Sequence, residues 1–324
     1  MAMLSYSRAI GQALGDAMDA DPDVILIGED IGEAGGPFGV TRGLRDKFGE
    51  MRVFDAPISE AAMVGAAVGA AMHGLKPVVE IMFMDFATLA MDAIVNQAAK
   101  AHFMFGGQRS LPMVIRMPHG GGIGAGPQHS QCLEAWFAHV PGLKVVCPSD
   151  VASVYALLRA AIDDPNPVIF VEQKARYAAK GELPDERPVA RIGEARTLRG
   201  GRDATVVTYG STVERALAAA DALSVDGIDV EVIDLQSIQP WDTRTVLDSV
   251  SRTHRLVVAH EATQAFGVGA EIAAYVGEQA FDELDAPVMR VGAPFMPVPF
   301  SKSMEQDFAP GQQRIADAVR KVME

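Results

Sequence analysis

A single carboxylate stands where a run of small apolar residues begins. Glu60 ends the segment Asp55-Ala-Pro-Ile-Ser-Glu60, and residues 61–72 contain only Ala, Gly, Val and Met. A helix without a polar face is expected to be buried in a core or an interface. A buried carboxylate seldom lacks a partner and can hold or share a proton near neutral pH. Two interpretations remain open: Glu60 performs proton chemistry, or either Ser59 or Glu60 caps the helix by satisfying its free N–H groups.

A second carboxylate, Glu29, follows an apolar segment at residues 24–27 that reads as a strand. Ligands of α/β proteins bind outside the carboxyl ends of parallel strands, which is where Glu29 is expected. Together with Glu60 it could relay protons or bind a metal ion. The alternative is a helix cap and a solvated loop.

An apolar cluster follows at the end of the strand expected over residues 77–83. Met82, Phe83 and Phe86 could form a wall for a planar ring, although such residues more often belong to an ordinary core.

A histidine, His129, follows a loop with five glycines between residues 120 and 126. Glycines allow close approach of the backbone to a ligand, and a histidine can exchange a proton near neutral pH. A lone histidine is nevertheless more often structural.

Familiar motifs of other enzyme classes are missing. The chain has no G-x-G-x-x-G opening a helix after the first strand, no G-x-x-x-x-G-K-[ST] and no G-x-S-x-G. His260-Glu261 lacks the second histidine of a zinc protease. The only cysteines, Cys132 and Cys147, form no C-x-x-C motif, which indicates reduced thiols rather than a zinc site or a disulfide framework.

The overall composition excludes further classes. With 28 basic and 42 acidic residues among 324, the formal charge is −14, which disfavours binding to nucleic acid or an anionic membrane. The N-terminus has no signal-peptide pattern, and the longest strongly apolar run is too short to span a bilayer. We therefore expect a cytoplasmic protein.

Strands that alternate with helices predict an α/β fold with a mainly parallel, doubly wound sheet. Helices are expected over residues 6–20, 85–100 and 151–162. We expect a first domain over residues 1–190, a linker rich in Pro, Gly and charge over 191–202, and a second α/β domain over 203–324.

Taken together, these segments resemble the β subunit of the E1 component of thiamine-diphosphate-dependent 2-oxo acid dehydrogenases, of the pyruvate and acetoin dehydrogenase type. The similarity runs in order along nearly the whole chain. The matching segments are residues 28–30, 52–55, 57–60, 64–74, 82–86, 96–100, 128–131, 141–149, 167–172, 206–210, 232–235 and 297–300. The resemblance implies a pyrimidine-binding domain followed by a transketolase-like C-terminal domain.

The resemblance also implies roles for single residues. Glu60 would hydrogen-bond N1′ of the cofactor's aminopyrimidine, and so activate the cofactor for attack on the 2-oxo carbon. Glu29 would belong to a chain of acids that links two active sites, and His129 would face the reacting side and assist acyl transfer. The residues expected to pack around the pyrimidine are Ile58, Met82 and Phe86.

The other half of the cofactor site has no counterpart in this chain. Thiamine enzymes hold Mg2+ and diphosphate through a Gly-Asp-Gly motif, which is absent here. The resemblance therefore implies an α subunit that carries the Mg2+, an α2β2 tetramer, and an E2 acyltransferase whose lipoyl domain receives the acyl group. Gly65 and Gly69 would allow close helix contacts at such an interface. A K+ ion could bind backbone carbonyls at Met113, Ala161, Ile162, Asp164 and Asn166.

The substrate is expected to be small. Pyruvate is the first expectation. Acetoin is the alternative, because residues 82–87, 104–107 and 177–184 look closer to acetoin-dehydrogenase β subunits. A branched-chain 2-oxo acid is a further alternative. A non-catalytic scaffold that docks the E2 core is the alternative from another class. A self-contained transketolase-like enzyme is disfavoured by the missing diphosphate motif.

Overall fold

The computed structural model describes residues 2–324, which form two compact units. Unit 1 comprises the chain up to His119 together with Trp136–Ile192. Unit 2 comprises Gly120–Ala135 together with Gly193–Glu324. The segment 120–135 therefore belongs by its contacts to the second unit, although the sequence places it in the first half of the chain.

Unit 1 is built on a parallel sheet whose strands lie in the order β6-β7-β5-β4-β2-β3. Each strand is short and mostly buried, as expected of a parallel sheet covered by helices on both faces. The register places Gly28 of β2 opposite Asp55 of β3 and Glu80 of β4. The strands are β2 (Val24–Gly28), β3 (Val53–Asp55), β4 (Lys76–Glu80), β5 (Val114–His119), β6 (Lys144–Val146) and β7 (Val168–Gln173). A separate antiparallel pair joins β1 (Ala2–Ser5) to β8 (Lys180–Leu183).

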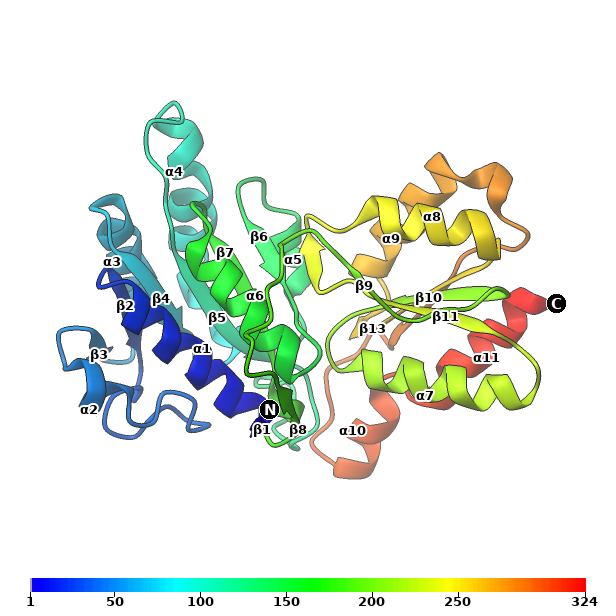
Figure 1. Cartoon of the computed structure of the whole chain (residues 1–324), viewed down its shortest axis with the longest axis horizontal. Helices are drawn as coiled ribbons and strands as arrows, with labels where there is room; N and C mark the ends of the chain where they lie inside the picture. Colours follow the sequence, from blue (N-terminus) through cyan, green and yellow to red (C-terminus); the bar gives the residue numbers. More distant parts are fainter. Residues whose placement is uncertain (1) are drawn as a thin grey trace. The chain divides into compact units, whose positions relative to one another are not determined.

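Two helices, α1 (Tyr6–Ala20) and α6 (Val151–Asp163), lie side by side against the sheet of unit 1 (Figure 1). Ser5 caps the first by accepting the N–H of Arg8 at 3.3 Å, and Asp150 caps the second. Their apolar faces enter one core, so the expected helices over 6–20 and 151–162 are confirmed. The remaining helical elements in the first half of the chain are α2 (Leu44–Phe48), α3 (Glu60–Met72), η1 (Met84–Ala90), η2 (Ala93–Ala98), α4 (Ala99–Met104), α5 (Glu134–Ala138) and η3 (Lys174–Arg176).

The segment after β4 departs from the expected pattern. The strand ends at Glu80 instead of Phe83, and a 3-10 helix, η1, follows. The expected single helix over 85–100 is divided into η1, the π-helical segment η2 and α4. Such irregular turns are uncommon, and π segments occur frequently at functional sites.

Helix α3 is buried on one face only. Met63, Val64, Ala67 and Val68 are buried where the helix packs on β4 and the η elements, whereas residues 61–62 and 65–66 are exposed. The expected burial in a core or an interface is therefore met on one face within this chain, and burial of the other face in an interface stays a prediction.

Unit 2 contains a five-stranded sheet in the order β14-β13-β10-β11-β9. It is parallel except for β9, which runs antiparallel to β11. Helices α7 and α11 cover one face and α8 and α9 the other (Figure 1). The strands are β9 (Arg196–Arg199), β10 (Ala204–Thr208), β11 (Val230–Asp234), β13 (Leu256–Thr263) and β14 (Met289–Ala293), with a short β12 (Ser237–Gln239). The helices are α7 (Thr212–Val225), α8 (Thr243–Thr253), α9 (Val268–Gln279), η4 (Phe281–Glu283), α10 (Lys302–Phe308) and α11 (Gln312–Met323).

Two α/β units with mainly parallel sheets confirm the expected fold class. The contact units divide at Ile192, and strand β9 occupies part of the segment 191–202 that the sequence suggests as a linker. The expected domain limits themselves stay a prediction. Within residues 2–324, no helix combines the length and the apolar character that crossing a bilayer requires.

Candidate active site

Glu29 and Glu60 are brought together in unit 1, where strand β2 ends and helix α3 begins. Both side chains are buried, with 6% and 4% of their surface exposed. Oε1 of Glu29 accepts no hydrogen bond in the described part of the chain. Ser59, which precedes the helix, makes no capping hydrogen bond with its side chain. The capping interpretation is therefore wrong for the Ser59 side chain. Oε1 of Glu29 remains a buried acceptor atom that the described residues leave without a hydrogen bond.

The environment of Glu29 favours its protonated form. Burial raises the pKa of Glu29 above its usual value, and the nearby charge of Glu60 raises it further, while the backbone N–H of Ser59 partly opposes the shift. A carboxyl group in this situation holds a proton at a higher pH than an exposed one does. Glu29 therefore lies near a second buried carboxylate, Glu60, and favours its own protonated form.

A glycine lets the backbone carrying Glu29 approach its neighbours closely. A Cβ on Gly28 would lie 2.7 Å from the Ile31 side chain, which would have to shift, and 3.2 Å from Glu80, a tight contact. The next turn is held by the Thr41 hydroxyl, which donates to the Ile31 carbonyl at 2.6 Å. The local fold thus fixes Glu29 at the end of β2.

Apolar side chains of the kind that could contact a planar ring are present in the same unit. Ile58, just before Glu60, is 82% exposed. Phe86 packs edge-to-face on Phe83 with 5.5 Å between ring centroids, and Phe83 packs likewise on Phe38 at 5.8 Å. Met82 and Phe86 are half-buried, so these residues are not a closed core.

Unit 1 also contains a buried ion cluster that the sequence analysis missed. Arg116 of β5 donates from Nε to Glu172 at 2.6 Å and from Nη1 to Glu80 at 2.6 Å. The Tyr177 hydroxyl donates to Glu172 at 2.6 Å, and its ring contacts that of Phe38 at 4.8 Å. The cluster therefore connects three strands to the aromatic residues.

The charges of this cluster stabilise the Arg116 cation, whereas burial raises the pKa of Glu80 and the charge of Arg116 only partly opposes that shift. Burial alone would lower the pKa of Arg116, but Glu172 and Glu80 outweigh it and raise the pKa above its usual value. Burial, and then the charge of Glu172, raise the pKa of Tyr177 well above its usual value. The feature of the sequence that could have indicated this cluster is Arg116, a lone arginine inside the apolar strand 114–117, since an arginine is seldom buried without a partner.

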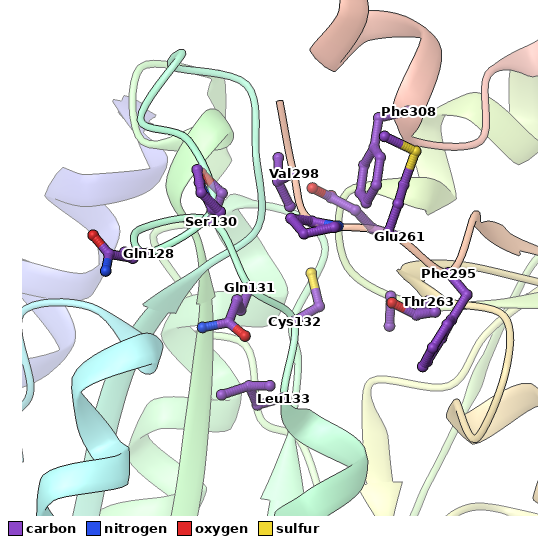
Figure 2. Close-up of a pocket in the computed structure, with 14 residues that line it drawn as sticks. Gln128, Ser130, Gln131, Cys132, Leu133, Glu261, Thr263, Phe295, Val298 and Phe308 are labelled. Carbon is purple, nitrogen blue, oxygen red and sulfur yellow. The ribbon is translucent and has the colours of Figure 1, made fainter. Parts of the chain in front are cut away.

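His129 belongs to unit 2. It is half-buried, and its backbone N–H donates to the Gly126 carbonyl at 3.3 Å. Its chain neighbours Gln128 and Ser130 line a cavity of about 530 Å3 (Figure 2). The other lining residues come from the same unit and are mostly apolar: Pro127, Gln131, Cys132, Leu133, Glu261, Ala262, Thr263, Phe295, Met296, Pro297, Val298 and Phe308.

The residues expected to hold K+ gather around the end of α6 in unit 1. Ala161 and Ile162 lie in the last turn, where carbonyls lack partners within the helix and the helix dipole favours a cation. The Asp164 side chain binds Lys144 at 2.5 Å and accepts the N–H of Asn166 at 2.9 Å, while the Met113 carbonyl accepts the N–H of Val168 at 3.0 Å. The donor set of oxygens fits a hard cation.

Parallel α/β units in tandem, with an acid pair beyond a strand of the first, define a transketolase-type protein. The family model described as "Transketolase, pyrimidine binding domain" matches residues 2–180, and "Transketolase, C-terminal domain" matches residues 193–315. The chain belongs to this family.

Individual relatives narrow the family. The chain is 46% identical to the β subunit of acetoin:2,6-dichlorophenolindophenol oxidoreductase from Cupriavidus necator, over 99% of this chain and 97% of the relative. It is 45% identical to the pyruvate dehydrogenase E1 component β subunit from Rhizobium meliloti, over 99% of this chain and 70% of the relative. The solved structure of a split-gene transketolase shares the fold, with a TM-score of 0.83 at 24% identity over 99% and 98% of the two chains. The chain is thus a member of the E1 β-subunit family, as the resemblance implied.

The family's domains imply dependence on thiamine diphosphate, and the residues of unit 1 fit its pyrimidine. The ring would need a buried acceptor and an apolar contact, which Glu29, Glu60 and Ile58 offer. When bound, the cofactor supplies the carbon nucleophile, while the protein orients it and moves protons.

Proposed function

We propose that this chain is the β subunit of an α2β2, thiamine-diphosphate-dependent E1 enzyme that decarboxylates a small 2-oxo acid, with pyruvate foremost. The acyl group then passes to the lipoyl domain of an E2 acyltransferase. The observation that carries the proposal is the buried pair Glu29 and Glu60, with an acceptor atom that this chain leaves unsatisfied. A buried polar atom without a partner costs free energy, so a ligand that satisfies it is favoured.

In this proposal Glu60 hydrogen-bonds N1′ of the aminopyrimidine and holds the proton there. Glu29 shares that proton through its coupling to Glu60. His129 assists the transfer of the acyl group. The side chains that pack around the pyrimidine are Ile58, Met82 and Phe86.

The proposal assigns the diphosphate and Mg2+ to a separate α subunit, so that activity requires both chains. The exposed face of α3 supports a protein partner, since a Cβ at Gly65 or at Gly69 would meet nothing within 4 Å. A partner helix could therefore approach that face closely. We further propose that a K+ ion binds at the end of α6 through the backbone carbonyls of the five residues named above. We also propose a cytoplasmic location.

Acetoin is the second candidate substrate, because the relative named as an acetoin:2,6-dichlorophenolindophenol oxidoreductase β subunit is 46% identical over nearly the full length of both chains. A branched-chain 2-oxo acid is the third. The cavity of unit 2 supports an aliphatic lipoyl arm as acceptor, because its lining is mainly apolar and includes both chain neighbours of His129.

The test is reconstitution with an E1 α subunit, thiamine diphosphate and Mg2+. Pyruvate, acetoin and a branched-chain 2-oxo acid are compared by their kcat/KM for dichlorophenolindophenol reduction and for acylation of a lipoyl domain. We expect turnover only with both chains, and fastest with pyruvate. A higher kcat/KM with acetoin would show that acetoin, not pyruvate, is the substrate. Turnover by this chain alone would overturn the proposal that the active site requires both chains.

A further inference from the structure

The glycine loop, residues 120–126, adopts a backbone that only glycine enters readily. Gly120, Gly122, Gly124 and Gly126 have φ values between +69° and +99°. Side chains in this left-handed region are strained. The loop precedes His129 by a few residues, and its shape therefore bears on where that histidine lies.

Two buried carboxylates of unit 2 bind the loop through its backbone. Oε1 of Glu261, at the end of β13, accepts the N–H of Gly121 at 2.7 Å. Oε2 of Glu305, in α10, accepts the N–H of Gly124 at 3.0 Å. The second oxygen of Glu261 accepts the hydroxyl of Ser211. Hydrogen bonds to a charged acceptor are about twice as strong as neutral ones, so these are firm anchors.

Burial makes these anchors unusual. Glu261 and Glu305 are 8% and 5% exposed, and no lysine or arginine pairs with either in the described part of the chain. Buried carboxylates are normally paired with a base. Here backbone N–H groups of the loop replace the base, which ties the position of the loop to the two acids.

Steric contacts close the loop onto the same unit. A Cβ on Gly120 would lie 2.7 Å from Oε1 of Glu261, and one on Gly126 would lie 2.2 Å from the ring of Phe300. The Gly126 carbonyl in turn accepts the N–H of His129. A path of direct contacts therefore runs from the anchors to His129.

The segment is also held beyond the histidine. Glu134 is fully buried and accepts the hydroxyl of Tyr209 at 2.8 Å. The Tyr209 ring stacks on that of His260, with 6.0 Å between centroids. His129 thus lies between two fixed ends of the segment 120–135.

We propose that Glu261 and Glu305 are positioning residues for His129: they hold the glycine loop so that the histidine is fixed for acyl transfer. The inference rests on the role proposed above for His129. It assigns to the C-terminal unit a part in the reaction that its sequence motifs do not show.

The test uses the assembled enzyme with Glu261→Ala, Glu305→Ala, His129→Ala and the double variant Glu261→Ala with His129→Ala. Glu231→Ala is the matched control, since Glu231 is also a buried glutamate of unit 2 but pairs with Arg252, at 2.7 Å, and not with the loop. Three quantities are measured: lipoyl-domain acylation, dichlorophenolindophenol reduction, and hydrogen exchange of the amides of Gly121 and Gly124.

We expect each anchor variant to slow acylation about 10- to 100-fold, because small displacements of a reacting group cost that much. Dye reduction, which bypasses the lipoyl acceptor, should change less than about twofold on the same argument. Amide protection at the anchored glycine should fall, and the double variant should be no slower than His129→Ala. Glu261→Gln and Glu305→Gln should restore acylation, because an amide oxygen can still accept the N–H.

The outcomes separate the two proposals. Slow acylation in His129→Ala but normal acylation in both anchor variants would overturn the positioning role and leave the proposed function intact. Unchanged acylation in His129→Ala would overturn the role of the histidine and the inference with it. If Glu261→Ala does not fold, Glu305→Ala decides the question at the other anchor. Loss of acylation in Glu231→Ala equal to that of the anchor variants would also overturn the inference.

Discussion

Among residues 2–324, two pairs of buried glutamates have no lysine or arginine as a partner, and the two pairs differ in the hydrogen bonds that they accept. In unit 1, Oε1 of Glu29 accepts no hydrogen bond from the described residues, and the apolar Ile58, two residues before Glu60, is exposed. In unit 2, Glu261 and Glu305 accept backbone N–H groups of the glycine loop, although Oε1 of Glu305, like Oε1 of Glu29, accepts no hydrogen bond within residues 2–324. We propose a ligand for the first pair, whereas the second pair binds a loop of the chain itself.

A third group shows what an ordinary structural solution looks like. Glu80 and Glu172 are as buried as the other four acids, and both are paired with Arg116. Burial of an acid by itself therefore indicates no function in this protein. The group that lies opposite the carboxylate is what distinguishes a structural acid from a positioning acid or from an acid proposed to take part in catalysis.

The largest expected effect is on turnover, in Glu60→Gln. An amide cannot exchange the proton at the pyrimidine, so kcat of the assembled enzyme should fall about 100- to 10,000-fold, the range of acid–base catalysis. Thermal unfolding should change little. Full activity of the Gln variant, with its fold verified by circular dichroism, would remove the distinction between the two pairs.

Next is the loss of the buried base in Arg116→Leu. Glu80 and Glu172 would remain buried without a basic partner, with only the Tyr177 hydroxyl still bound to Glu172, so the free energy of unfolding should fall by about 3–5 kcal/mol. Arg252→Leu is the control, because this pair with Glu231 is 56% exposed on its arginine side and should cost at most about 1 kcal/mol. Urea unfolding of both variants measures the difference, and equal losses would contradict the prediction.

A smaller effect is expected in the loop, from Gly126→Ala. The φ of +74° and the ring of Phe300 both oppose a Cβ, so we expect a loss of roughly 1–2 kcal/mol in unfolding free energy. Gly277→Ala provides the control, because this glycine of α9 has open space around its Cβ position and should become more stable by about 0.5–1 kcal/mol. Stabilisation of both variants would show that the loop is not held as described.

The smallest expected effect is the pH dependence contributed by Glu29. Its raised pKa means that the folded chain binds this proton more tightly than the unfolded chain does. The ionised group therefore lowers stability as the pH rises from about 4.5 through the folded pKa. Glu29→Gln should be more stable than the parent chain at neutral pH, with the difference shrinking toward pH 4. A difference that grows on acidification, measured by unfolding across this range, would reverse the sign.

Much of this architecture was open to prediction from local patterns. Helix α1 was expected over residues 6–20 and is found there, because its apolar spacing and the following Asp21-Pro22 are local signals. Glu29 and Glu60 were expected as a pair because each lies next to a strand or helix end. The irregular elements η1 and η2 could not be predicted, since tertiary packing overrides the helical spacing there.

The residues that anchor the glycine loop, Glu261 and Glu305, cannot be predicted from any local sequence pattern. Glu261 is 140 residues from Gly121, and Glu305 is 181 residues from Gly124. In the sequence, Glu261 appeared only within a failed zinc-protease motif. The Arg116 cluster is similar, because its three strands come together only through the order of the sheet.

The sequence by itself determined the chemistry that each side chain can perform, the alternation of strands and helices, and the absence of a diphosphate motif. These features depend on residue identity and on neighbours within a few positions. Only the tertiary structure decided that residues 120–135 belong with unit 2, that α3 keeps an exposed face, and which buried acids find partners. These outcomes depend on contacts between residues far apart in the chain, where geometry rather than local preference selects the partner.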